Sequence, residues 1–277
     1  MNSKTLTIGD LSLNVVYCLS GEFNPVVKIP NPRALQDRGP VSWTKPIQVT
    51  LNGFWMATTP VTQSVWRWVM HGNLGHSQLP EYAMSWPSAD LFCVKLSALL
   101  HDSGQLELNQ TVSLPTLMER EYAARAGCES NWFWEDDSDG VAAYFWNSGD
   151  LSRQQFHDVG LKKPNPWGLY DLYRMGDEWC MDDSSFIFED KMYVNPVYCS
   201  NYNVDRKVTT GTSPKSFAQP LLVSSVDLNN EEGFDTTVRF VITDYERSMQ
   251  KVTPVPLNTD PSLYLSSPES VDSSEQK

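Results

Sequence analysis

The sequence predicts a single, compact α+β domain with little regular secondary structure. Helical patterns are confined to the first half of the chain, whereas residues 128–250 show short strand-like stretches separated by loops. The 277 residues are 40% hydrophobic and 12% aromatic, which is enough apolar material for one large core. Because large rings fill uneven spaces, the aromatic content fits an irregular interior.

Alternating apolar and polar side chains predict the first strands. The alternation from Leu6 to Val15 indicates an opening strand or hairpin. Residues 21–46 contain five prolines and are expected to form a long loop. Alternation returns over residues 47–51, which predicts a strand followed by an extended segment.

Three helices are expected next. Thr62 can cap the first, and a proline in the first turn favours the second, over about residues 87–100. The third helix runs to Arg125 and stops at Gly127, since glycine commonly ends a helix. The side chains expected on the buried faces of the first two helices are Val65, Trp66, Val69, Met70, Phe92, Leu96 and Leu99.

The net charge of −13 argues against nucleic acid and anionic membranes as direct partners, because both attract basic proteins. No stretch approaches a transmembrane helix in length, and the first residues lack the apolar run of a secretion signal. Five scattered cysteines without a C-x-x-C pair are typical of reduced thiols in a cytoplasmic protein. The folded domain is expected over residues 1–250, and the Pro/Ser-rich residues 251–277 are expected to be a disordered tail.

Four sequence blocks occur in the order found in one protein family. They are FWMATTPVTQSVWRWVM (54–70), MSWPSADLFCVKL (84–96), SLPTLMEREYAARAG (113–127) and WNSGDLSRQQFHDVGLKKPNPWGLYDLYRMGDEW (146–179). Together they make the chain resemble the formylglycine-generating-enzyme (sulfatase-modifying-factor) family over about residues 45–240. The resemblance implies a compact C-type-lectin-like α+β domain. It also implies that Trp167, Tyr170 and Trp179 fill the space between a loop and the helices as part of the architecture.

The chain departs from this family where the family does its oxidation chemistry. The resemblance implies two copper-binding cysteines after residues 207–213, but Ser216 and Leu221 stand at those positions. A hydroxyl and an aliphatic chain do not hold Cu(I), so copper and formylglycine generation are not expected. His71 and His76 give only a weak metal signal.

A calcium site stays open as an alternative. The resemblance implies calcium-binding loops, although Met175 stands where the family has an asparagine ligand. The residues that could still serve such a site are Asn147, Asp171 and Glu178.

Two functions remain open at this point. The first is a non-catalytic module, a pseudoenzyme that binds a protein or peptide; the resemblance to members of bacterial multi-protein systems implies such a partner. The second is a metal-dependent oxidoreductase of the same superfamily with a relocated site, for which Cys180, Cys199 and a histidine are the candidate ligands. For the binding module, residues 184–236 have the adaptable Tyr/Ser/Asn composition of recognition loops. The candidate contact residues are Tyr193, Tyr198, Asn201, Tyr202 and Asn203.

Overall fold

The computed structural model describes residues 2–30, 42–73, 75–128, 133–134, 141–146, 156–183, 191–200, 206–211, 224–227 and 236–252. Its helices are α2 (Gln63–His71), α3 (Trp86–Asp102), α4 (Leu117–Arg125) and the short 3-10 helix η1 (Val141–Ala143). Its strands are β1 (Ser3–Ile8), β2 (Leu11–Cys18), β3 (Gly21–Phe23), β4 (Val26–Pro30), β5 (Ser42–Pro46), β6 (Val49–Leu51), β7 (Phe54–Ala57), β8 (Thr111–Ser113), β9 (Asp177–Asp183), β10 (Tyr193–Val194), β11 (Pro196–Ser200), β12 (Arg206–Thr210), β13 (Ser224–Asp227), β14 (Thr236–Thr237), β15 (Val241–Thr243) and β16 (Ser248–Val252).

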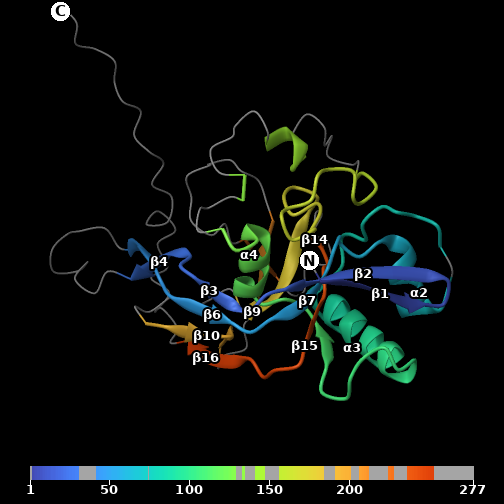
Figure 1. Ribbon diagram of the computed structural model, residues 1–277, viewed down its shortest axis with the longest axis horizontal. Helices are drawn as coiled ribbons and strands as arrows, with labels where there is room; N and C mark the ends of the chain where they lie inside the picture. The colour runs from blue at the N-terminus through green and yellow to red at the C-terminus, as the bar shows by residue number, and fades with distance from the viewer. Residues whose placement is uncertain are drawn as a thin grey trace, which may run out of the picture.

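The largest sheet has the strand order β1-β2-β7-β15-β8 and is antiparallel throughout (Figure 1). Its first two strands form the predicted hairpin, which turns at Gly9 with a φ of +57°. The expected loop over residues 21–46 is wrong, because β3, β4 and β5 lie within it. Two of its prolines, Pro30 and Pro46, end β4 and β5, where a missing backbone N–H is tolerated.

All three predicted helices are present. The Thr62 side chain accepts a hydrogen bond from the Val65 N–H and caps α2 as expected. In α4 the Thr116 side chain and Glu119 form a reciprocal capping box, and the chain leaves the helix through Ala126 and Gly127, both at positive φ.

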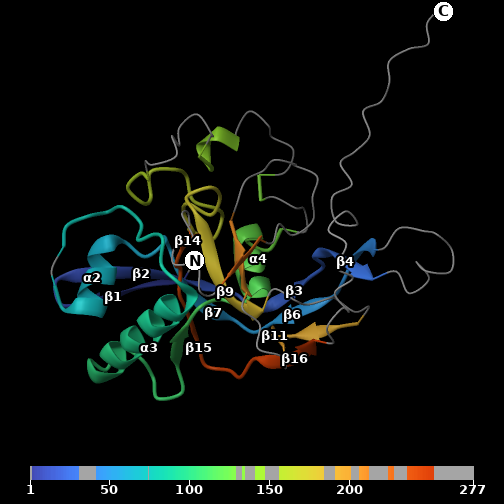
Figure 2. The ribbon, with the colours of Figure 1, turned by 180° about the vertical axis from the view of Figure 1, so that it is seen from behind.

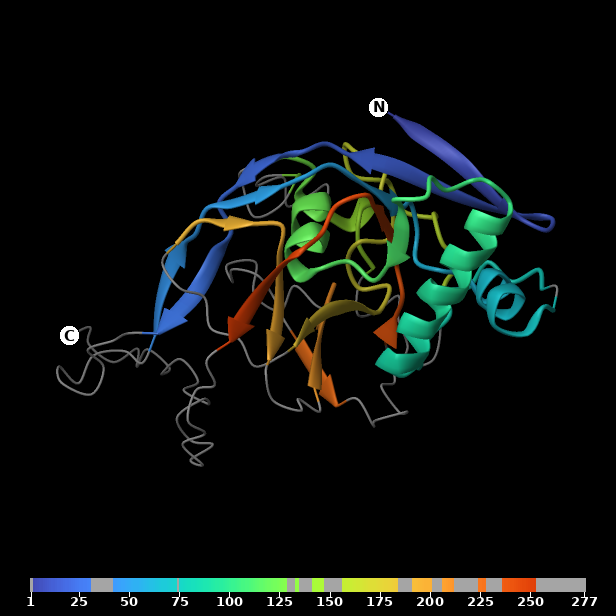
Figure 3. The same ribbon diagram turned by 90° about the horizontal axis from the view of Figure 1, so that it is seen from below.

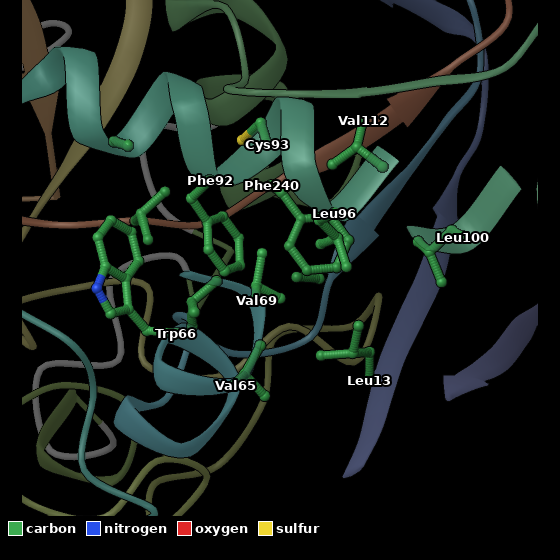
Figure 4. Packing of buried hydrophobic residues seen from close by; sticks show 14 of the residues in the cluster. Leu13, Val65, Trp66, Val69, Phe92, Cys93, Leu96, Leu100, Val112 and Phe240 are labelled. Carbon is green, nitrogen blue, oxygen red and sulfur yellow. The ribbon is translucent and has the colours of Figure 1, made fainter. Parts of the chain in front are cut away.

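The buried stripe of α3 differs from the prediction at one position. Phe92 and Leu96 are fully buried, but Leu99 is 36% exposed and Leu100 is buried in its place. Figure 4 shows Phe92 and Leu96 of α3 facing Val65, Trp66 and Val69 of α2. The rings of Trp66 and Phe92 stack at 5.1 Å between centroids, so the two helices share one core.

A second sheet, in the order β13-β12-β9-β14, lies against α4. Strands β11 and β16 pair in parallel on the opposite side of the molecule from α3, as Figure 2 shows. Because β16 ends at Val252, two residues of the expected tail belong to a strand. Residues 253–277 lie outside the described residues, so their proposed disorder stays a prediction.

One side chain covers the outer edge of β1 at Thr7. Gln105 accepts a hydrogen bond from the Thr7 N–H through Oε1 at 2.7 Å and donates to the Thr7 carbonyl through Nε2 at 2.8 Å. The side-chain amide thus occupies the place of a neighbouring strand at this residue. Among the described residues, no helix combines the length and apolar character that crossing a membrane requires.

Candidate functional site

The most deeply buried charges form a three-residue network in the centre of the molecule. Glu178 on β9 accepts a hydrogen bond from Arg120 of α4 at 2.5 Å between Nε and Oε2. Its other oxygen lies 2.9 Å from Nη2 of Arg239, which precedes β15. All three side chains are almost completely excluded from solvent. Burial alone would raise the pKa of Glu178, but the two guanidiniums outweigh it and hold that pKa below its ordinary value.

Main-chain carbonyl oxygens accept further hydrogen bonds from both guanidiniums. Arg120 donates to the Leu172 carbonyl at 2.6 Å, and Arg239 donates to the Tyr170 carbonyl at 2.8 Å and to the Ala57 carbonyl at 3.0 Å. A buried charge is tolerated only when it is paired and hydrogen-bonded, and these arginines meet both conditions. The network therefore ties α4, β9 and the strand β15 to the loop before β9.

A second network fixes the start of α4. Glu119 accepts hydrogen bonds from Arg247 through both carboxylate oxygens, each at 2.8 Å, and from the Tyr245 hydroxyl at 2.9 Å. It also accepts from the Thr116 N–H at 2.9 Å. Glu119 is fully buried, so the bidentate arginine balances a charge that would otherwise be costly.

Asp182 on β9 is a third buried acid. In the described part of the chain, the hydrogen bonds that its carboxylate accepts come from main-chain N–H groups. It accepts from the Leu117 N–H at the start of α4 at 2.7 Å and from the Tyr198 N–H at 3.0 Å. Burial raises the pKa of Asp182 to about 7. This group can therefore change its charge near neutral pH while it joins β9, α4 and β11.

The described thiols are structural. Cys18, Cys93 and Cys180 are buried and unpaired, and burial raises the pKa of each. A thiol with a raised pKa is a poor nucleophile and a poor metal ligand at neutral pH. Cys128 is partly exposed.

Two of the candidate calcium residues, Glu178 and Asp171, lie in surroundings that do not fit a divalent cation. Both oxygens of Glu178 already bind guanidiniums, so a divalent cation there would meet two buried positive charges. One oxygen of Asp171 accepts from the Gly160 N–H at 2.6 Å. The other oxygen of Asp171 makes no hydrogen bond among the described residues. Burial raises the pKa of Asp171, and the indole N–H of Trp146 offsets part of that rise. Asn147 lies outside the described residues.

The histidines also do not assemble a metal centre in the described part of the chain. No group of three or more His, Cys, Asp or Glu side chains there is arranged to hold a metal ion. The ring of His157 instead stacks on Trp146 at 4.1 Å between centroids. His71 and His76 are exposed.

Two of the five candidate contact residues belong to the core, which corrects the expectation that they are exposed. Tyr198 is 2% exposed and Tyr193 is 3% exposed, and their rings meet edge to face at 5.9 Å. The reason is that β10 and β11 pair with β6 and β16, which turns both rings inward. Asn201, Tyr202 and Asn203 lie outside the described residues, as do Ser216 and Leu221.

The outer face of α3 carries several exposed apolar side chains. Leu91 is 46% exposed and Val94 is 57% exposed, and Pro87 and Ala98 are exposed on the same side. Figure 3 shows α3 at the rim of the molecule. Sequence reasoning missed this face because it assigned only one apolar stripe to the helix.

Sequence reasoning also missed the arginines of the buried network. Arg120 lies in the helical block 113–127, where the sequence does not distinguish a buried arginine from an exposed one. Arg239 lies in the apolar run V-R-F-V-I, which could have indicated a buried charge.

Solved structures share this fold. Treponema denticola variable protein 1 aligns with a TM-score of 0.64 at 21% identity, covering 86% of this chain and 98% of that one. PvdO from Pseudomonas aeruginosa aligns with a TM-score of 0.61 at 15% identity, covering 86% of this chain and 97% of that one. At these identities the likeness concerns the fold alone.

One curated protein is related in sequence. "Chaperone protein LppX" from Paenibacillus barcinonensis is 26% identical over 178 residues, which cover 48% of this chain and 64% of that protein. The match thus spans less than two thirds of that relative's length.

The profile of the "Sulfatase-modifying factor enzyme 1-like domain" matches residues 28–219, which is more than half of the chain. That stretch contains α4, β9 and the loop that receives the two buried arginines. The chain therefore belongs to the sulfatase-modifying-factor family and has its mixed α+β fold of limited regular structure.

Proposed function

We propose that this chain is a protein- or peptide-binding module of the sulfatase-modifying-factor family, without formylglycine-generating activity. The observation that carries the proposal is the apolar outer face of α3. A helix on the surface of a soluble domain normally turns polar side chains outward. A continuous exposed apolar stripe marks an interaction site more often than single exposed leucines do.

The stripe has the spacing of a helix–helix contact. Pro87, Leu91, Val94 and Ala98 follow one another at intervals of four, three and four residues. At about 100° per residue, these positions fall within roughly 60° of the helix circumference. Such an arc fits the apolar face of one partner helix.

Charge favours a basic partner over a second copy of this chain. The chain carries a net charge of −13, so two copies would repel each other, whereas a cationic partner would be attracted. Asp102 is exposed at the end of the same helix and adds local negative charge. We therefore infer that the partner segment is an amphipathic helix with basic flanks.

Other observations support binding over catalysis. The three described core cysteines are buried with raised pKa values, and the sequence places Ser216 and Leu221 where the family has copper-binding thiols. The relative that carries the name chaperone supports a role directed at another protein. Three buried cysteines without a disulfide, Cys18, Cys93 and Cys180, support a reducing, cytoplasmic setting.

A designed peptide tests the binding face. The probe is a helical peptide of about 18 residues with leucine on one face and lysine elsewhere, long enough to form a helix. We expect fluorescence anisotropy to show binding that Leu91→Ser combined with Val94→Ser weakens at least tenfold. Leu161→Ser is the matched control, because Leu161 is 64% exposed elsewhere on the surface. Equal binding by all variants would mean attraction by charge alone and would refute the proposed face.

Two further measurements separate the alternatives. In sedimentation, a dimer that the α3 double variant dissociates would identify a second copy as the occupant and overturn the inferred basic partner. After reconstitution with copper or iron under reducing conditions, tightly held stoichiometric metal would favour the oxidoreductase. We also expect no loss of thiol from a C-x-P-x-R peptide incubated with the protein, copper and oxygen, as measured by mass spectrometry.

A further inference from the structure

The loop before β9 turns its oxygens inward around buried positive charge. The Tyr170 and Leu172 carbonyls and the carboxylate of Glu178 all accept hydrogen bonds from guanidiniums, at 2.5–3.1 Å. The Gly176 carbonyl lies beside the same centre, since it, the Leu172 carbonyl and Arg120 Nη2 would all lie within 3.5 Å of a side chain at Gly211.

The backbone of this loop is shaped for that purpose. Four residues in it have positive φ: Gly168 (+80°), Asp171 (+53°), Arg174 (+64°) and Gly176 (+131°). Two of these are not glycine, so they hold a conformation that their side chains disfavour. The surroundings must compensate for this, and the hydrogen bonds that the two guanidiniums donate to the carbonyls do so.

Oxygen sets of this kind are what a hard divalent cation takes. Here Arg120 and Arg239 together supply two positive charges, the same charge as one divalent cation. They face Glu178, and Asp171 is close enough for its charge to be felt by Arg239. An added calcium ion would therefore bring two surplus positive charges into a fully buried centre.

We propose that the guanidiniums of Arg120 and Arg239 are the permanent cation of this loop, and that the domain is built to fold without calcium at Asp171 and Glu178. Arg120 is the residue that decides this, because it reaches both the carboxylate and the loop carbonyl from a separate helix. This assignment is independent of the proposed binding function, since it concerns how the loop is held.

The test compares calcium responses of the purified full chain. For the wild type, we expect the melting temperature to be the same in CaCl2 and in EDTA, and calorimetry to show no calcium binding. Arg120→Ser removes the guanidinium and leaves the oxygens, so it should melt lower in EDTA and regain about 5 °C or more when CaCl2 is added. Arg247→Ser is the matched control, because it also removes a bidentate partner of a buried glutamate, and it should not respond to calcium.

Two results would overturn the proposal. One is a calcium-dependent rise in the melting temperature of the wild type. The other is an Arg120→Ser protein that melts lower with no response to calcium. If Arg120→Ser does not fold in EDTA, refolding from urea is compared with and without CaCl2, and Arg120→Gln gives a second variant that keeps donors without charge. Refolding that depends on calcium supports the proposal, and failure under both conditions for both variants counts against it.

Discussion

Replacing Glu178 by glutamine removes one buried negative charge and almost no volume. The amide oxygen can still accept from one guanidinium, but the amide nitrogen then faces the other donor. Arg120 and Arg239 would remain buried with two positive charges and no carboxylate between them. Breaking a buried ion pair in this way costs about 3–5 kcal/mol of unfolding free energy.

This loss is large against the whole stability of a domain, which is typically about 5–15 kcal/mol. For a domain of this size each kcal/mol shifts the melting temperature by about 2–4 °C, so Glu178→Gln should melt about 6–20 °C below the wild type. Urea unfolding followed by tryptophan fluorescence measures the free energy directly.

The matched control is Glu246→Gln, the same change at an exposed position beside Arg247. It should shift the free energy of unfolding by no more than about 0.5 kcal/mol. If Glu178→Gln also loses less than about 1 kcal/mol, the buried network does not stabilise the fold, and the assignment of the two arginines as balanced charges is wrong.

Three other changes test separate parts of the structure. The folded-state pKa of Asp182, about 7, lies above its ordinary value of 3.8, so the folded protein holds a proton that the unfolded chain releases. Stability should therefore fall as pH rises from about 4 to about 7, by at most about 1.4 kcal/mol per pH unit, and urea midpoints for Asp182→Asn should lack that slope. Asn165 donates to the Ala123 and Ala124 carbonyls at the end of α4 and accepts from two main-chain N–H groups, so Asn165→Asp should lower the unfolding free energy by about 3 kcal/mol; an unchanged urea midpoint would exclude this cap. Tyr198→Ala should cost about 3–5 kcal/mol in the same assay, because its ring is buried; a variant as stable as the wild type would place that ring at the surface after all.

Elements specified by neighbouring residues could be predicted from the sequence. The hairpin follows from an alternation of apolar and polar side chains. Helix α2 follows from its cap and its apolar face, and the end of α4 follows from its stop signal. The role of Trp179 as architecture also follows, since it is fully buried and its indole N–H donates to the Met84 carbonyl at 3.0 Å.

Features that depend on distant partners could not be predicted. Arg120 and Arg239 lie 58 and 61 residues from Glu178, and nothing local to any of them indicates the pairing. Tyr198 has the composition of a recognition loop around it, but pairing between β11 and β16 turns its ring into the core. Tertiary pairing thus reversed a conclusion drawn from composition alone.

The contact between Gln105 and the edge of β1 affects how this protein behaves at high concentration. A free strand edge offers a row of donors and acceptors on which another chain can add its own strand, and such growth leads to aggregates. By holding both main-chain groups of Thr7, Gln105 leaves an incoming strand only the first residues of β1 to pair with. The Gln105→Ala variant should fold like the wild type but aggregate faster than the wild type on storage. The reason is that its sheet could then extend from one molecule to the next.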